Sequence, residues 1–244
     1  MINKLQLQSI ISKYYLNVNE SVKWETKNNK LKIEFMSPTK DVIGAVKCNN
    51  FKLEDSALAI YDTKKLSNLI SICNGDLLLE LEKNHKTFTK LKISDLNFNL
   101  TYAISDPLLI GKVGTVNVPD FVVELNLNNE NVENLIKAKS ALSGIDNMLV
   151  TTTKDLDGMD VCEFVFGDES GHNNKITYQI PGNILEQNLK IPFNSDTFKT
   201  ILHANKDMES GTLKISTMGL MEIKFQSEDI ESEYYVVRKA ETEF

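Results

Sequence analysis

The sequence predicts an α+β protein made of two domains with the same topology. Three observations lead to this prediction. Most of the chain alternates between apolar and polar residues with a period of two, which is typical of half-buried strands. Only four short segments have the spacing of amphipathic helices. The order of strands and helices in the first half of the 244-residue chain recurs in the second half.

The predicted strands form antiparallel sheets, because short turn sequences such as SPTK (37–40) and NGD (74–76) separate neighbouring strands. The strands expected in the first half are LKIEFM (31–36), DVIGAVKC (41–48), DLLLELEK (76–83), FTKLKIS (88–94) and FNLTYAIS (98–105). Those expected in the second half are DFVVELNL (120–127), NMLVTTT (147–153), MDVCEFVFG (159–167), NKITYQI (174–180), GTLKIST (211–217), LMEIKFQ (220–226) and SEYYVVRK (232–239).

The helices are predicted over 4–16, 63–73, 129–143 and 195–206. Their apolar faces consist of Leu7, Ile10, Ile11 and Tyr14; Leu66, Leu69, Ile70 and Cys73; Val132, Leu135, Ile136 and Ala138 or Lys139; and Phe198, Ile201 and Leu202. Asp62 is expected to cap the second helix, and Asn194 or Ser195 the fourth. Helices this short are stable only when their apolar faces lie on a sheet.

The helix patterns also indicate an internal duplication. A shift of 132 residues lays Leu66, Leu69 and Ile70 over Phe198, Ile201 and Leu202, and a shift of 125 lays the first helix over the third. The expected domains are therefore 1–106 and 120–244, joined by a connector at 107–119. The connector is apolar, whereas linkers are usually polar. It either packs on the body of the protein or helps to form a docking groove, and the two are compatible.

Composition indicates an intracellular protein. The cysteines Cys48, Cys73 and Cys162 are far apart and read as buried, reduced thiols. The start of the chain lacks the apolar core of a signal peptide, and no apolar run approaches the length of a membrane span. Arg238 is the only arginine, which disfavours sequence-specific reading of DNA bases.

No catalytic motif is recognisable in the sequence. It contains no glycine-rich phosphate loop, no GxSxG elbow and no HExxH. Acidic pairs such as Asp155/Asp157 and Glu231/Glu233 fall in expected turns or on exposed strand faces. We therefore expect no enzyme activity, no metal site and no cofactor, and a scaffold or binding role instead.

Lysine is concentrated on the predicted helices although the net charge of the chain is -7. The helical lysines outnumber the acids at or beside the helices, Glu130, Glu133, Asp196 and Asp207, so the strands and loops carry the excess acid. A basic surface of this kind attracts a polyanion. The alternative is ordinary solubilising lysine, which helices favour anyway. The helical lysines are Lys4, Lys13, Lys64, Lys65, Lys137, Lys139, Lys199 and Lys206.

Four stretches carry a resemblance to a known family: ALAIYDTKKLSNLISIC (57–73), PFNSDTFKTILHAN (192–205), EYYVVRKAETEF (233–244) and the apolar connector after SDP. The chain resembles the DNA polymerase sliding clamps, most closely the clamp of T-even-type tailed phages. The resemblance implies the DNA clamp fold, a homotrimeric ring with sheets outside and helices lining a hole for duplex DNA. The eight helical lysines would then face the DNA, and no cofactor would be needed.

The resemblance also implies partners and interfaces. The expected partners are double-stranded DNA, a DNA polymerase, a clamp-loader ATPase and factors of late transcription, in the cytoplasm of a virus-infected host. Subunits are expected to join by pairing 98–105 with 174–180, through Phe98, Leu100, Tyr102, Ile104, Ile176, Tyr178 and Ile180. Partner tails are expected in a groove of Leu108, Leu109, Ile110, Val118, Tyr235 and Val237.

Two other functions remain open from the sequence alone. A non-catalytic structural β-protein of a phage particle would assemble without DNA. A hydrolase with an unrecognised site would need a clustered nucleophile and base, which the sequence does not show.

Overall fold

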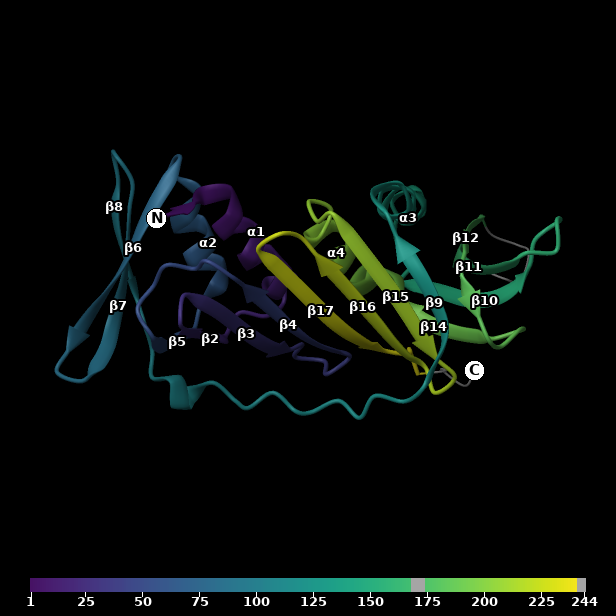
Figure 1. Cartoon of the computed structure of the whole chain (residues 1–244), viewed down its shortest axis with the longest axis horizontal. Helices are drawn as coiled ribbons and strands as arrows, with labels where there is room; N and C mark the ends of the chain where they lie inside the picture. The colour runs from purple at the N-terminus through teal and green to yellow at the C-terminus, as the bar shows by residue number, and fades with distance from the viewer. Residues whose placement is uncertain (168–173, 241–244) are drawn as a thin grey trace. The chain divides into compact units, whose positions relative to one another are not determined.

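The computed structural model describes residues 1–167 and 174–240, and within them the chain divides into two compact units. The first unit comprises Met1–Thr115 with Glu228–Ser232, and the second comprises Val116–Ser227 with Glu233–Phe244. The division at Thr115 falls inside the connector expected at 107–119. Figure 1 labels most of the elements of both units.

The first unit contains eight antiparallel strands and two α-helices. Four of the strands form a sheet with the order β1-β6-β7-β8, and the other four are hydrogen-bonded in the order β5-β2-β3-β4. The elements are β1 (Ile2–Asn3), α1 (Lys4–Tyr15), β2 (Val22–Lys27), β3 (Lys30–Met36), β4 (Val42–Cys48), β5 (Ser56–Ile60), α2 (Thr63–Ser71), β6 (Asp76–Asn84), β7 (Thr87–Ser94), β8 (Asn99–Ala103) and the short 3-10 helix η1 (Pro107–Leu109).

The second unit repeats this arrangement and adds one short strand. Its sheets have the orders β12-β11-β10-β14 and β13-β9-β15-β16-β17. The elements are β9 (Phe121–Leu127), α3 (Asn129–Ala141), β10 (Asn147–Lys154), β11 (Asp160–Gly167), β12 (Lys175–Pro181), β13 (Asn183–Ile184), β14 (Lys190–Asn194), α4 (Ser195–Ala204), β15 (Ser210–Ser216), β16 (Leu220–Gln226) and β17 (Ile230–Val237), whose residues up to Ser232 are counted with the first unit.

The predicted α+β class and duplicated topology are confirmed. Each unit runs strand, helix, three strands, a further strand, helix and three strands, with the same neighbours in its sheets apart from the added β13. Strands β2, β5 and β14 were not predicted, and neither were the two-residue strands β1 and β13. Pro192 interrupts β14, and β5 has only five residues, so both lack the length and pattern that mark a strand.

Each helix begins at an asparagine or aspartate whose side chain accepts a hydrogen bond from a backbone N–H in the first turn. These capping residues are Asn3, Asp62, Asn128 and Asn194. The caps expected at Asp62 and Asn194 are therefore present. The apolar faces turn inward, with Leu7, Ile10 and Leu66 fully buried.

Aromatic side chains fill the centre of each unit. In the first, the buried Trp24 ring meets Tyr14 and Phe51 edge-to-face, with centroids 6.4 and 6.0 Å away. In the second, Phe164 of β11 stacks on Phe198 of α4 at 5.7 Å. These contacts hold the helices on the sheets and so fix which helix faces reach solvent.

Candidate nucleic-acid interface

The first turn of α2 presents Lys64 and Lys65 to solvent. Their backbone N–H groups donate to Glu20 (3.2 Å) and to Asp62 (2.8 Å), so the helix N-terminus is capped by two carboxylates. Both lysine side chains are exposed, and in the described part of the chain neither ammonium has an ion pair. The exposed carboxylates of Glu20 and Asp62 lie beside the two lysines, so the positive charge on α2 is confined to the lysine side chains themselves.

Lys4 joins the two helices of the first unit. Its Nζ donates to the carbonyl oxygens of Ser71 (2.7 Å) and Cys73 (2.6 Å), at the C-terminal end of α2. A cation there satisfies carbonyls that lack a partner within the helix and lies favourably in the helix dipole. The charge of Lys4 is thus engaged within the unit.

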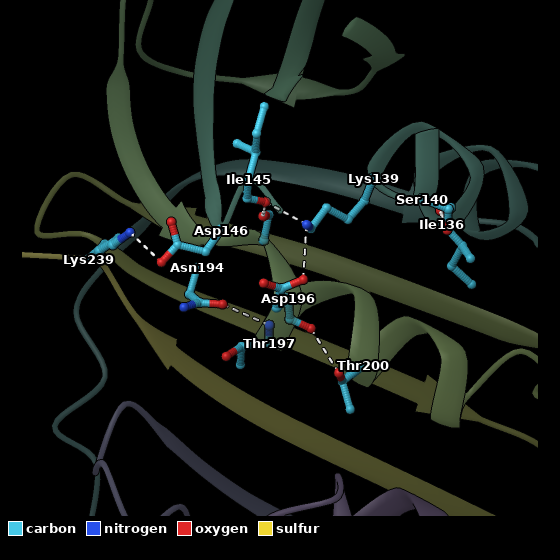
Figure 2. Close-up of polar contacts among 11 residues, drawn as sticks. Ile136, Lys139, Ser140, Ile145, Asp146, Asn194, Asp196, Thr197, Thr200 and Lys239 are labelled. Carbon is cyan, nitrogen blue, oxygen red and sulfur yellow. Dashed lines mark hydrogen bonds and ion pairs between the residues drawn. The ribbon is translucent and has the colours of Figure 1, made fainter. Parts of the chain in front are cut away.

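Burial removes Lys13 and Lys139 from the lysines able to meet DNA. Lys13 is fully buried, with Nζ donating to Ser9 Oγ at 2.6 Å. Lys139 is 3% exposed, and its Nζ donates to the carbonyl of Ile145 and pairs with Asp196 at 2.9 Å. Figure 2 shows Lys139 reaching from α3 to the start of α4. Both lysines lie among the apolar residues of their helices, so helical spacing places them inward.

The second unit presents three further lysines. Lys137 of α3 is exposed and pairs with Glu133 at 3.3 Å, a surface ion pair that contributes little to stability. Lys199 of α4 is half-buried, and Lys206 is exposed just beyond the end of that helix. Six of the eight predicted lysines are therefore at least partly exposed. Lys4 is engaged at the end of α2, and the other five are Lys64, Lys65, Lys137, Lys199 and Lys206.

The residues expected at subunit interfaces lie on or directly beside two edge strands, β8 and β12, each paired on one side only among the described residues, with Phe98 and Ile104 flanking β8. Tyr102 and Ile180 are buried, whereas Phe98, Leu100, Ile104, Ile176 and Tyr178 are partly exposed. The Tyr102 hydroxyl donates to the Asp62 carbonyl at 3.1 Å, and the Tyr178 hydroxyl donates to Asn131 at 2.9 Å. Tyr102 and Ile180 therefore pack within their own units, whereas the other five side chains are at least partly open to solvent.

The backbone of both strands remains available for pairing. Ile104 N–H donates to Thr89 and Asp95 N–H to Phe98, so even-numbered residues of β8 bond to β7. Asn99, Thr101 and Ala103 therefore direct their N–H and C=O groups to the open edge. The ladder register of β10, β11 and β12 directs those of Lys175, Thr177 and Gln179 outward in the same way.

The six residues expected to bind partner tails divide between the units. Leu108 and Leu109 are 90% and 67% exposed, held in η1 by the Asp106 side chain, which accepts from Leu108 N–H at 2.9 Å. Ile110 is partly exposed, and residues 111–120 form neither helix nor strand. In the second unit Val118 and Val237 are exposed, and the half-buried Tyr235 donates its hydroxyl to Glu233 at 2.7 Å. The apolar residues at the start of the connector are thus left open to a partner.

The described residues show no metal-binding arrangement. In 1–167 and 174–240, no group of His, Cys, Asp and Glu side chains is placed to hold a metal ion. All three cysteines are buried and free, as predicted. Burial raises the pKa of the Cys48 thiol to about 11 and that of Cys162 to about 12, so both stay protonated at neutral pH. No helix in this part of the chain is long and apolar enough to cross a membrane.

Comparison with known proteins identifies the fold. No protein-family model matches the chain, and no curated protein matches it in sequence. Among solved structures, A. fulgidus PCNA bound to the C-terminal region of FEN-1 superposes with a TM-score of 0.78 at 14% identity, covering 99% of this chain and 98% of that one.

Two further structures agree. PCNA from Entamoeba histolytica has a TM-score of 0.75 at 11% identity, covering 98% and 96% of the two chains. The PCNA2-PCNA3 complex from Sulfolobus tokodaii also gives 0.75, at 10% identity, covering 99% and 98%. The chain therefore has the fold of the PCNA-type DNA sliding clamps over nearly its whole length.

Proposed function

We propose that this protein is a sliding clamp that encircles duplex DNA and tethers a replicative DNA polymerase. The observation that carries the proposal is the clamp fold over 99% of the chain. The alternative of a structural β-protein finds no support among the structural neighbours.

The exposed lysines supply the electrostatic attraction that such a function needs. A clamp must hold DNA and still slide past every sequence, which requires phosphate-directed contacts without base reading. Lys64, Lys65, Lys137, Lys199 and Lys206 are flexible point charges on or beside helices, and the remainder of this acidic chain discourages binding elsewhere.

The assembly that we propose is a homotrimer closed by antiparallel pairing of β8 with β12 of the next subunit. Each strand offers three outward-facing residues in alternation, at 99, 101 and 103 and at 175, 177 and 179. Pairing would cover two edges that otherwise invite aggregation. A multimer also matches the neighbour described as a complex of PCNA2 and PCNA3.

Partners are proposed to dock on the apolar residues of the connector and the last strand. The structure of a PCNA bound to the C-terminal region of FEN-1 offers a precedent for a tail as ligand. For this chain the partners would be a polymerase, a clamp-loader ATPase and factors of late transcription, in the cytoplasm of a phage-infected host. The exposed Leu108 and Leu109 are the first residues to test.

The decisive experiment combines mass with topology. Light scattering should give three subunits per particle. Nicked circular duplex should retain the protein through gel filtration, and cutting the circle should release it. A chain that stays monomeric at high concentration, or that binds linear and circular DNA alike, would refute the ring.

The lysines are tested by the salt dependence of DNA binding. Replacing Lys64 and Lys65 by methionine should reduce the slope of log K against log salt by about 1.8, because each phosphate that a lysine neutralises adds about 0.9 to the slope. The matched control replaces Lys27 and Lys30, two exposed lysines that flank the turn between β2 and β3, and should leave the slope unchanged.

A further inference from the structure

Strand β6 has an open edge along its middle. On one side β7 pairs with it from Leu78 to Asn84. On the other side β1 pairs only with Leu77 and Asp76, and no other described strand continues the ladder. The edge beyond Leu77 is therefore available for pairing.

The sheet register shows which backbone groups lie on this edge. Odd-numbered residues of β7 bond to β8, since Thr89 accepts from Ile104 N–H. Even-numbered residues of β7 therefore bond to Leu78, Glu80 and Glu82 of β6. Leu79 and Leu81 consequently direct their N–H and C=O groups away from β7, to the open side.

A groove of about 560 Å³ runs beside this edge. Leu79, Glu80 and Leu81 line one wall, and Asn29 with the segment Lys52, Leu53 and Glu54 lines the other. An ion pair between Lys83 and Glu54, at 2.7 Å, lies at one end. The Leu79–Leu81 edge is about 7 Å long, which suits a strand of three to four residues.

The side chains of the groove select by polarity and charge. Leu53 and Leu79 are each 7% exposed and form an apolar floor. Glu80 is exposed on the opposite face of the strand, and its cross-strand neighbour on β7 is Lys92. Lys92 forms its ion pair with Glu82 at 2.9 Å, so within the described residues Glu80 has a cation on its β7 side but no ion pair of its own. A strand added here would place apolar residues opposite Leu79 and Leu81, and between them a residue opposite Glu80.

The equivalent edge in the second unit is closed. There β15 takes the place of β6, and β9 pairs with it from Gly211 to Ser216. Strand β13 in turn covers β9. The open edge is thus a difference between two otherwise matching units.

We propose that β6 accepts an extended segment of a partner protein as an added strand, with an apolar–basic–apolar sequence at its centre. Backbone bonds to Leu79 and Leu81 supply the register, and a lysine or arginine opposite Glu80 supplies selectivity. A second copy of β6 fits less well, because antiparallel pairing centred on Glu80 sets two carboxylates opposite each other. This proposal is independent of the proposed function as a DNA sliding clamp.

Hydrogen exchange on the intact protein tests the edge itself. The amides of Leu79 and Leu81 should exchange faster than those of Leu78 and Glu80, which bond to β7. Equal protection of all four would overturn the proposal, because the edge would then already be covered.

Binding is tested with end-blocked, fluorescent pentapeptides by anisotropy. Thr-Val-Lys-Val-Thr should bind about three- to tenfold more tightly than Thr-Val-Glu-Val-Thr, and N-methylation of both valines should abolish binding. Equal binding of the two peptides, retention by the methylated peptide, or no binding at millimolar concentration would each overturn the proposal.

Two protein variants locate the peptide. Glu80→Lys should reverse the preference between the two peptides. Leu81→Pro should abolish binding, because its missing N–H faces the open edge, whereas Leu81→Ala should retain it. The proposal would be overturned if Glu80→Lys left the peptide preference unchanged or if the two Leu81 variants bound the peptide equally. It would also be overturned if the particle mass doubled through β6 in the absence of peptide. If the proline variant fails to fold, the result with Glu80→Lys decides.

Discussion

The buried ammonium of Lys139 offers the sharpest test of how this fold uses its lysines. Replacing it by methionine removes the charge and keeps an unbranched stem of similar length. The Ile145 carbonyl keeps its hydrogen bond from Ser195 Oγ at 2.9 Å, and the Asp196 side chain is 63% exposed, so water replaces its ammonium partner. Neither acceptor is left buried and unpaired.

The magnitude follows from these interactions. Hydrogen bonds to charged groups contribute about 1.5–3 kcal/mol each, but burying the ammonium offsets part of that gain. Since no buried acceptor is orphaned, we expect Lys139→Met to lower the free energy of unfolding by about 1–2 kcal/mol. For a chain of this size that corresponds to a melting temperature lower by about 2–8 °C in calorimetry.

Lys137 provides a control on the same helix, two residues away. Lys137→Met removes an exposed cation from a surface pair, so the free energy of unfolding should change by less than about 1 kcal/mol. Its DNA-binding salt slope should fall by about 0.9, whereas Lys139→Met should leave the slope unchanged. The reasoning is refuted if Lys139→Met leaves the melting temperature unchanged and reduces the salt slope instead.

Three other outcomes follow from the structure. Thr101→Pro removes an outward N–H of β8, so light scattering should show monomers where Thr101→Val still assembles. Hydrogen bonds from backbone N–H groups, that of Phe98 foremost, hold the pKa of Asp95 below its ordinary value. Asp95→Asn should therefore destabilise the protein at pH 7. The difference in urea midpoint between the variant and the original protein should shrink as pH falls through the folded-state pKa of Asp95. Gly219→Ala should cost about 1–3 kcal/mol in urea denaturation, because φ is +83° and a Cβ would meet Arg238; an unchanged midpoint would contradict this.

The sequence predicted the helices and the duplication well, because both depend on a strong apolar period. All four helices lie within their expected ranges, and the offsets of 125 and 132 residues relate helices that occupy the same place in their units. Strand β2 was missed although VKWETK alternates with its apolar and Thr side chains inward. Charged residues on its outer face made it resemble a loop.

The lysines show where counting charge along a sequence fails. Lys139 follows Val132 and Leu135 at helical spacing, so the pattern itself places it on the buried face. Its charge suggested a solvent position, but a nearby carbonyl and Asp196 allow the ammonium to stay inside. Those partners come from a loop and from α4, and only the folded chain brings them to the end of α3.

The packing of Trp24 gives this protein an internal optical probe. It is the only tryptophan in the chain and is fully shielded between Tyr14 and Phe51 in the first unit. Tryptophan emission of the native protein therefore comes from a single buried environment, and a red shift during denaturation reports loss of structure in the first unit. Comparing that transition with circular dichroism, which averages over the whole chain, would show whether the duplicated halves lose their structure together or in sequence.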